Sequence, residues 1–248
     1  MKVLRTILLS VFAFCIISCS SEDEKIDYIN LYPSISEEYR TDTINGWAIS
    51  HDETERVCYL RFFQAGQDPI EKLYGSPTSF DEVKHLFPLS EGNEIRLTDK
   101  GEIEASEGFP EYKQYFEDYI QYYKGVPVDS YARFYYYITP QGKRMSYAMI
   151  EPFIDIKNLD PNPSISEQEA RQIFANHLNV TRDDTWRCSL DIKEFSSRNS
   201  KGIIRNQRLV YLVWGPYAPG DPGIMYIRAP QYHALIDAHT GEIIYLSI

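Results

Sequence analysis

The chain has 248 residues, of which 43% are hydrophobic and 25% are charged, and its formal net charge at pH 7 is −11. This length and apolar content suit one large folded domain or two domains of ordinary size. An acidic surface repels phosphate backbones, so the composition argues against a nucleic-acid partner.

Residues 1–18 are predicted to be a signal peptide. Lys2 and Arg5 precede an apolar run over residues 7–17, which is about half of the ~20 residues that a membrane-spanning helix needs. The run ends at Ser18 and Cys19, an ending that resembles a lipobox, in which a small residue precedes a cysteine to be lipidated. We therefore expect lipidation at Cys19 and a membrane anchor of more than one acyl chain.

Residues 19–35 are predicted to be a polar tether after the lipidated cysteine. Their acidic start, residues 20–25, resembles a signal that some Gram-negative bacteria use to send lipoproteins to the outer face of the membrane. Acidic tethers also serve solubility alone, so both interpretations stay open. The sequence thus predicts an outer-membrane lipoprotein of the cell envelope, either periplasmic or surface-exposed.

Residues 36–157 are predicted to form a first folded unit. A β-branched and aromatic run over residues 57–63 indicates a buried strand. Residues 79–87 begin with a capping-box pattern, Ser79 with Glu82, and indicate a helix that Pro88 ends. A turn is expected at residues 99–101. The remaining expected strands cover residues 94–97, the tyrosine-rich segment 112–128 with a bend at Gly125, and residues 133–138 and 145–156.

Residues 158–163 are rich in proline and asparagine and are the predicted linker to a second unit, residues 164–248. Ser166 and Glu169 form a second capping-box pattern before a helix with an apolar stripe. A loop rich in proline and glycine is expected over residues 215–223, and strands over residues 209–214, 224–228, 231–238 and 242–246. The expected fold class is α+β, with antiparallel sheets that are each packed with a helix.

Three segments carry a resemblance to a known family. Residues 121–128, QYYKGVPV, look like a strand of the thermolysin/fungalysin propeptide (FTP) family. The helix start at Glu169-Ala170 and residues 235–244 resemble the opening and closing parts of the PepSY module, which usually follows that strand. The resemblance implies two cystatin-like units that fold beside a peptidase, hold it inactive and assist its folding. The sequence departs from the family pattern in that it ends at Ile248, where a peptidase domain would be expected to begin, and in that Asp129-Ser130 stand where the family often has glycine.

The residues that carry this resemblance also have structural interpretations. Gly125 permits positive φ or a close approach, and Pro127, between Val126 and Val128, suits a sheet edge or a bulge. Asp237 can accept hydrogen bonds from turn amides, and Gly241 can take the positive φ that closes a hairpin.

The sequence contains no recognisable catalytic motif. None of its five histidines forms HExxH, and it has no GxSxG elbow, P-loop or CxxC pair. We therefore expect no catalytic residue, no metal and no cofactor. Cys58 and Cys188 could form a disulfide in an oxidising compartment, or remain two separately buried thiols.

Nine tyrosines gather in the middle of the chain. They are Tyr112, Tyr115, Tyr119, Tyr122, Tyr123, Tyr131, Tyr135, Tyr136 and Tyr137. They could present a ligand-binding face or simply pack one face of a sheet. Three functions follow: a propeptide-like module that binds and inhibits or chaperones a peptidase, such as a thermolysin-like metallopeptidase; a cell-surface lipoprotein that binds glycans or peptides; or a structural partner in envelope assembly.

Overall fold

Eleven strands make up most of the residues that the computed structural model describes, which are 40–44, 47–52, 54–62, 75–103, 113–140, 142–199, 202–217 and 231–247. The strands of the N-terminal part are β1 (Arg40–Ile44), β2 (Trp47–His51), β3 (Val57–Arg61), β4 (Asn93–Ile103), β5 (Gln114–Tyr123), β6 (Val126–Thr139) and β7 (Gly142–Ile150). Those of the C-terminal part are β8 (Cys188–Asn199), β9 (Gly202–Tyr217), β10 (Gln231–Asp237) and β11 (Ile243–Ser247).

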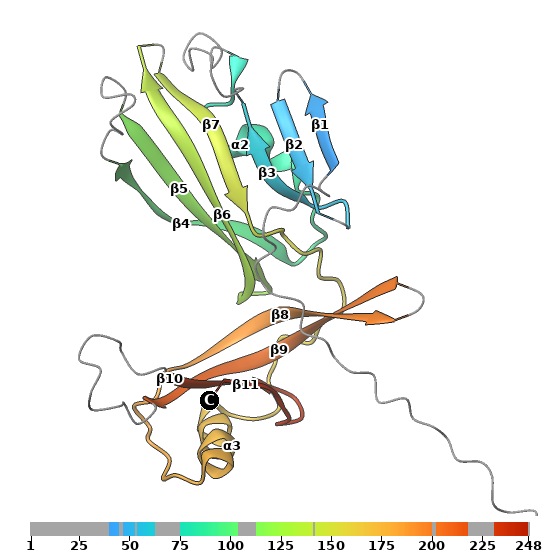
Figure 1. Ribbon diagram of the computed structural model, residues 1–248, viewed down its shortest axis with the longest axis vertical. Helices are drawn as coiled ribbons and strands as arrows, with labels where there is room; N and C mark the ends of the chain where they lie inside the picture. The colour runs from blue at the N-terminus through green and yellow to red at the C-terminus, as the bar shows by residue number, and fades with distance from the viewer. Residues whose placement is uncertain are drawn as a thin grey trace, which may run out of the picture.

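Strand β6 joins the two parts into one mixed sheet. Along one side it pairs with β5, which in turn pairs with β4. Along its other side it meets β8 in parallel at Val128 and then β7 in antiparallel fashion from Ala132 onward. Because β6 has 14 residues, it is long enough to take a different neighbour at each end. The two parts therefore share a continuous backbone connection at this strand (Figure 1).

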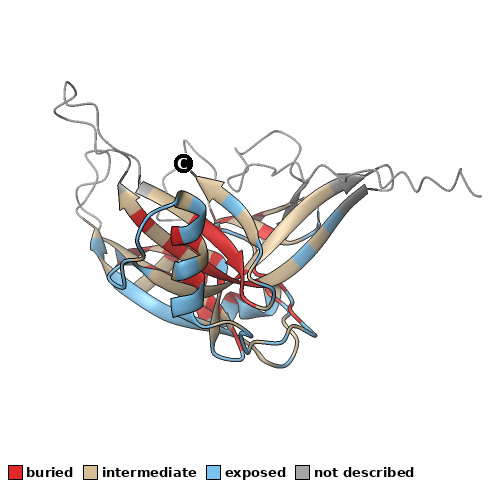
Figure 2. Ribbon diagram, turned by 90° about the horizontal axis from the view of Figure 1, so that it is seen from below, coloured by how far each residue is buried: buried red, intermediate tan, exposed pale blue. Residues whose placement is uncertain are grey.

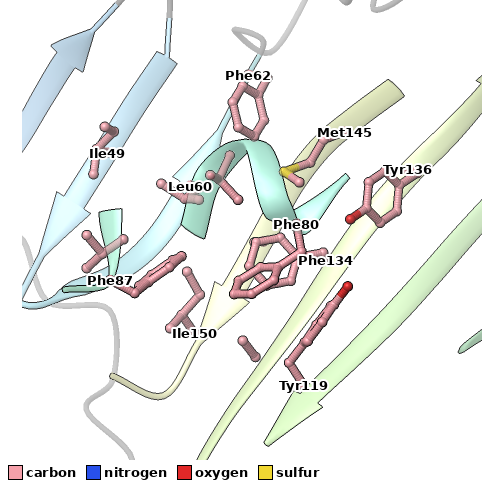
Figure 3. Close-up of a cluster of buried hydrophobic side chains, with 14 of the residues drawn as sticks. Ile49, Leu60, Phe62, Phe80, Phe87, Tyr119, Phe134, Tyr136, Met145 and Ile150 are labelled. Atoms are coloured by element: carbon pink, nitrogen blue, oxygen red, sulfur yellow. The ribbon is translucent and has the colours of Figure 1, made fainter. Parts of the chain in front are cut away.

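The N-terminal sheet curves around a short helical segment, α2 (Phe80–Val83) followed by the 3₁₀ turn η2 (Lys84–Leu86) (Figure 1). Successive strand residues point to opposite faces, and the inner face carries fully buried side chains such as Leu60, Phe134 and Ala148. Phe80 from α2 packs edge-on against Phe134, with ring centroids 5.2 Å apart. Figure 3 shows this aromatic core between α2 and the strands.

The C-terminal part is a four-stranded antiparallel arrangement with one helix, α3 (Glu167–Leu178), on one face (Figure 1). The Ser166 capping box starts α3, and Asn179 ends it in the left-handed conformation. Gly215 of β9 lies very close to Phe174 of α3. A Cβ added at Gly215 would lie 2.5 Å from the ring of Phe174. Figure 2 shows the buried residues of α3 in red and its exposed residues in pale blue.

The expected α+β fold of two cystatin-like units, each sheet packed with a helix, is wrong. Strands dominate the described residues, and the sheet is mixed rather than antiparallel throughout. In the N-terminal part, α2 spans only four residues, which is too short to cover a sheet of seven strands. Aromatic side chains from strands β5 and β6, from α2 and from connecting segments fill that core instead, because tyrosine and phenylalanine bury large areas.

Several local predictions also differ from the structure. Strand β7 ends at Ile150, although sheet was expected up to residue 156, and β9 extends to Tyr217, into the loop expected over residues 215–223. The helix expected over residues 79–87 is α2 with a 3₁₀ turn, and the Ser79 side chain makes no capping bond, since Thr78 binds Glu82 instead. The turn expected at residues 99–101 is strand, with a bulge between Leu97 and Asp99. The bend at Gly125 is a full reversal between β5 and β6. The strand predicted at residues 224–228 lies outside the described residues.

Two clusters of buried side chains form the core. The first lies within residues 49–153, and the second combines residues 154–238 with Tyr123 and Val128 from the β5–β6 hairpin. The exact division into units at residues 157 and 164 stays a prediction. The signal peptide, the tether and the lipidation site Cys19 lie outside the described residues. Within those residues, no helix has the length and apolar content to cross a membrane.

Candidate functional site

The Gly125 hairpin places the GVPV run where the two parts meet. Lys124 and Gly125 have φ values of 47° and 88°, and Tyr123 pairs with Val126 across them. Two consecutive residues with positive φ define the tight turn that suits a twisted hairpin. Of the two roles considered for Gly125, a close approach or a positive φ, the structure has the positive φ, and no atom lies within 4 Å of a Cβ placed there.

Pro127 and Val128 follow this turn and lead into the junction. Pro127 pairs with Tyr122 beside a register shift in β5, as expected for a proline at a bulge. Val128 is 2% exposed and is the residue of β6 that pairs with Ile192 of β8. The GVPV run thus joins the N-terminal sheet to the C-terminal core.

The other predicted turn lies at Asp237. Its Oδ1 accepts hydrogen bonds from the backbone N–H groups of His239 at 3.0 Å and Thr240 at 2.9 Å, and Gly241 has a φ of 76°. Burial alone would raise the pKa of Asp237, but these amides lower it below its ordinary value. Asp237 and Gly241 therefore have the structural roles predicted for them, in closing the β10–β11 hairpin.

A pocket of about 240 Å³ lies at the junction, and we call it the junction pocket. Its lining residues are Ile120, Pro127, Val128, Asp129, Ser130, Tyr131, Glu151, Asp191, Lys193 and Leu212. Lys193 forms an ion pair with Asp129, with Nζ and Oδ2 2.6 Å apart. Asp191 accepts a hydrogen bond from the Ser189 hydroxyl at 2.9 Å. Three residues with carboxylates and one lysine thus line this pocket.

The outer face of the N-terminal sheet, opposite the core, carries a second feature, which we call the outer patch: Tyr59, Arg133, Tyr135, Tyr147 and Met149. Strand pairing places Tyr59, Met149 and Arg133 in one row across β3, β7 and β6. Tyr147 and Tyr135 form the next row, in which Arg61 of β3 is the other neighbour of Tyr147. Met149 is 53% exposed. Cross-strand partners share a face, so these five side chains form one surface.

The rings of the outer patch already contact one another and a cation. Tyr135 and Tyr147 stack with centroids 4.2 Å apart and an interplanar angle of 16°. The guanidinium of Arg133 lies 4.5 Å from the centroid of Phe116. It also donates two hydrogen bonds to the buried carboxylate of Asp118, both 2.7 Å long. The patch is therefore a preorganised surface in which the charge of Arg133 is paired with that of Asp118.

The inner face holds a buried polar cluster around Glu117. Its Oε1 lies 2.6 Å from Nζ of Lys143, and its Oε2 accepts hydrogen bonds from the hydroxyls of Tyr119 at 3.0 Å and Tyr136 at 2.8 Å. Figure 3 shows these two hydroxyls turned toward one another. Burial alone would raise the pKa of Glu117, but these donors lower it. Both carboxylate oxygens of Glu117 therefore have partners inside the protein, which is typical of a buried polar group with a structural role.

The tyrosines predicted to gather do lie on the adjacent strands β5 and β6, but on both faces. Tyr119, Tyr123 and Tyr136 are buried in the cores, and Tyr135 belongs to the outer patch. Tyr112 lies outside the described residues. Tyr59, Tyr147 and Met149 were missed by the sequence analysis, because their strands become neighbours of β6 only through the tertiary fold.

Cys58 and Cys188 are free, half-buried thiols, so the disulfide alternative is not realised in this structure. Cys58 lies in β3, and its Sγ donates to the carbonyl of Ser50 at 3.3 Å. Cys188 starts β8 and packs against the second core. Burial raises the pKa of each thiol to about 11, so both are protonated at neutral pH.

The described residues contain no group of three or more His, Cys, Asp or Glu side chains that could hold a metal ion. Comparison with models of known protein families and with curated protein sequences gives no match to this chain. The likeness to the FTP and PepSY families therefore stays a prediction that depends on the residues quoted for it.

Proposed function

We propose that this chain is a non-catalytic lipoprotein of the outer membrane, anchored through Cys19, that binds a partner protein on its outer patch. The observation that carries the proposal is the composition of this patch. Tyrosine, methionine and arginine are enriched in protein interfaces, and tyrosine and arginine dominate their binding energy. Here three tyrosines, an arginine and a half-exposed methionine share one sheet face.

The arrangement of the rings favours a protein partner over a glycan. A sugar ring stacks on the open face of an aromatic ring. In the outer patch, Tyr135 and Tyr147 cover one another, and Arg133 covers Phe116 beside them. A protein surface needs no open ring face, since it can pack against ring edges, the methionine side chain and the aliphatic part of arginine.

The class of partner that we propose is a peptidase, which the chain restrains or helps to fold. Support for this class comes from the resemblance of residues 121–128 and 235–244 to propeptide modules. A partner in envelope assembly would use the same patch and differ only in what is bound.

Inhibition assays test this proposal. The purified full chain, at micromolar concentration, is expected to slow peptide hydrolysis by at least one enzyme of a panel of thermolysin-like metallopeptidases. Met149→Lys should weaken inhibition at least ~10-fold, because it places a charge in a desolvated contact. Val180→Lys is the matched control, since Val180 is 43% exposed and lies just after α3. No inhibition by the wild-type chain across the panel would contradict a peptidase partner.

A further inference from the structure

The outer patch and the junction pocket lie along the same strand. Residues 129, 131, 133 and 135 of β6 alternate with core-facing residues and therefore share a face. Arg133 and Tyr135 belong to the patch, while Asp129 and Tyr131 line the pocket. The six residue steps from Asp129 to Tyr135 span about 20 Å. An extended segment of about seven residues laid along β6 would contact both features.

The charges at the two ends of this strand differ. In the patch, Arg133 is neutralised by its two hydrogen bonds to Asp118. Arg61 borders the patch beside Tyr147, and the tyrosine rings and Met149 offer apolar contact. In the pocket, Lys193 pairs with Asp129, and the charge of Arg187 also acts on Asp191. The three carboxylates of Asp129, Glu151 and Asp191 still outnumber these two cations. The pocket end therefore has an excess of negative charge.

Desolvation makes the ionised form of the two pocket carboxylates less favourable than it would be in water. Burial raises the pKa of Asp191, and desolvation together with the charge of Asp129 raises that of Glu151, although Lys193 acts in the opposite direction on both. A cation placed in the pocket would favour the ionised form of both carboxylates. The net charge of the whole chain, −11, favours the approach of a basic partner as well.

From these contacts we infer that the partner supplies an extended segment along β6, with apolar side chains on the outer patch and one lysine or arginine in the junction pocket. This inference rests on the proposed function and names the chemistry of the bound segment. An acidic or phosphorylated segment is disfavoured, because its charge would meet Glu151 and Asp191 and find Arg133 already occupied.

Selection from a library of random decapeptides tests the inference on the full chain in detergent. Peptides selected by the wild-type chain are expected to carry a lysine or arginine at a constant spacing from apolar residues. Replacing that basic residue with glutamine in the best peptide should weaken its affinity about 10-fold or more. The double variant Asp191→Asn, Glu151→Gln should abolish this difference, whereas Glu91→Gln, an exposed acid outside the pocket, should preserve it.

The outcomes separate the inference from the proposed function. If no peptide is selected, or the selected peptides lack a basic residue, the inference is wrong. The selected peptides could lack a basic residue and bind the Met149→Lys variant more weakly than the wild type. In that case the outer patch still binds the peptide and only the assignment of the pocket fails. If binding is indifferent to Met149→Lys, the outer patch is not the docking surface and both claims fail.

Discussion

The side-chain amide of Gln121 makes both of the hydrogen bonds that a neighbouring strand would offer to Ile154. Its Nε2 donates to the Ile154 carbonyl at 2.5 Å, and its Oε1 accepts the Ile154 N–H at 2.8 Å. Asn93 likewise donates to the carbonyl of Ile156 at 2.7 Å. Side-chain amides thus hold the segment that crosses between the two cores, where the backbone is not paired in a strand.

These two hydrogen bonds between Gln121 and Ile154 predict that Gln121→Leu lowers the stability of the fold considerably. The substitution leaves the buried N–H and carbonyl of Ile154 without partners, at about 1–3 kcal/mol for each group. We expect the free energy of unfolding, measured by urea denaturation, to fall by roughly 3 kcal/mol. Gln172→Leu on the exposed face of α3 is the control and should change it by less than about 0.5 kcal/mol. A Gln121→Leu variant as stable as the control would show that the hydrogen bonds between Gln121 and Ile154 do not stabilise the fold.

The hairpin turn predicts that Gly125→Ala destabilises the chain through its backbone alone. A Cβ at Gly125 meets no atom within 4 Å, but φ there is 88°, so the cost is about 1–2 kcal/mol. Gly75 also has open space and no positive φ, and Gly75→Ala should therefore be neutral or slightly stabilising. Thermal unfolding of the two variants measures the difference. Equal melting temperatures would show that the turn is not formed as described.

The Glu117 cluster predicts a pH dependence of stability. The pKa of Glu117 is lowered in the folded state, so its contribution is fully present above the unfolded pKa of about 4.3. It is lost as pH falls through the folded value. Wild-type stability should therefore drop more steeply below pH ~5 than that of Glu117→Gln, which should be less stable at pH 7.

The matched control for this pH series is Glu102→Gln. Glu102 also has a lysine partner, Lys113 at 3.4 Å, but both side chains are largely exposed, so the pair contributes at most ~1 kcal/mol. Denaturant titrations from pH 3 to pH 7 measure the free energy of unfolding at each pH. Its loss at low pH should be the same in Glu102→Gln as in the wild type and smaller in Glu117→Gln. The same loss of unfolding free energy at low pH in all three proteins would contradict the role assigned to Glu117.

Free thiols at Cys58 and Cys188 predict a simple chemical result. In denaturant without reductant, both should react with iodoacetamide, and mass spectrometry should find both alkylated. In the folded chain at pH 8 the reaction should be much slower, because the pKa of each thiol is raised to about 11 and only the thiolate reacts. A peptide cross-linked through both residues would show that the disulfide forms after all.

Features that depend on local chemistry were predictable from the sequence. The capping box of Ser166 and Glu169, the turn at Asp237 and the positive φ of Gly125 each need only a few neighbouring residues. Features that depend on strand register were not. Three consecutive tyrosines, residues 135–137, hide the alternation that separates the outer Tyr135 from the buried Tyr136.

The fold class and most of the outer patch depend on contacts between distant segments. Tyr59 and Met149 are 90 positions apart and meet only because β3 pairs with β7. Strand β8 was not predicted, although Cys188, Leu190 and Ile192 alternate with polar residues in the pattern of a half-buried strand. The small extent of helix over the N-terminal sheet has no local signal. Gln121 was noted as part of a family pattern, but its role at Ile154 requires the crossing segment to be in place.

Site-specific photo-cross-linking in living cells tests the binding role of the outer patch most directly. A benzophenone side chain replaces Met149 in one version of the full chain and Val180 in another. We expect one discrete protein adduct from position 149 that is missing from position 180. No adduct at position 149, or the same adducts at both positions, would contradict the claim that this face binds a partner.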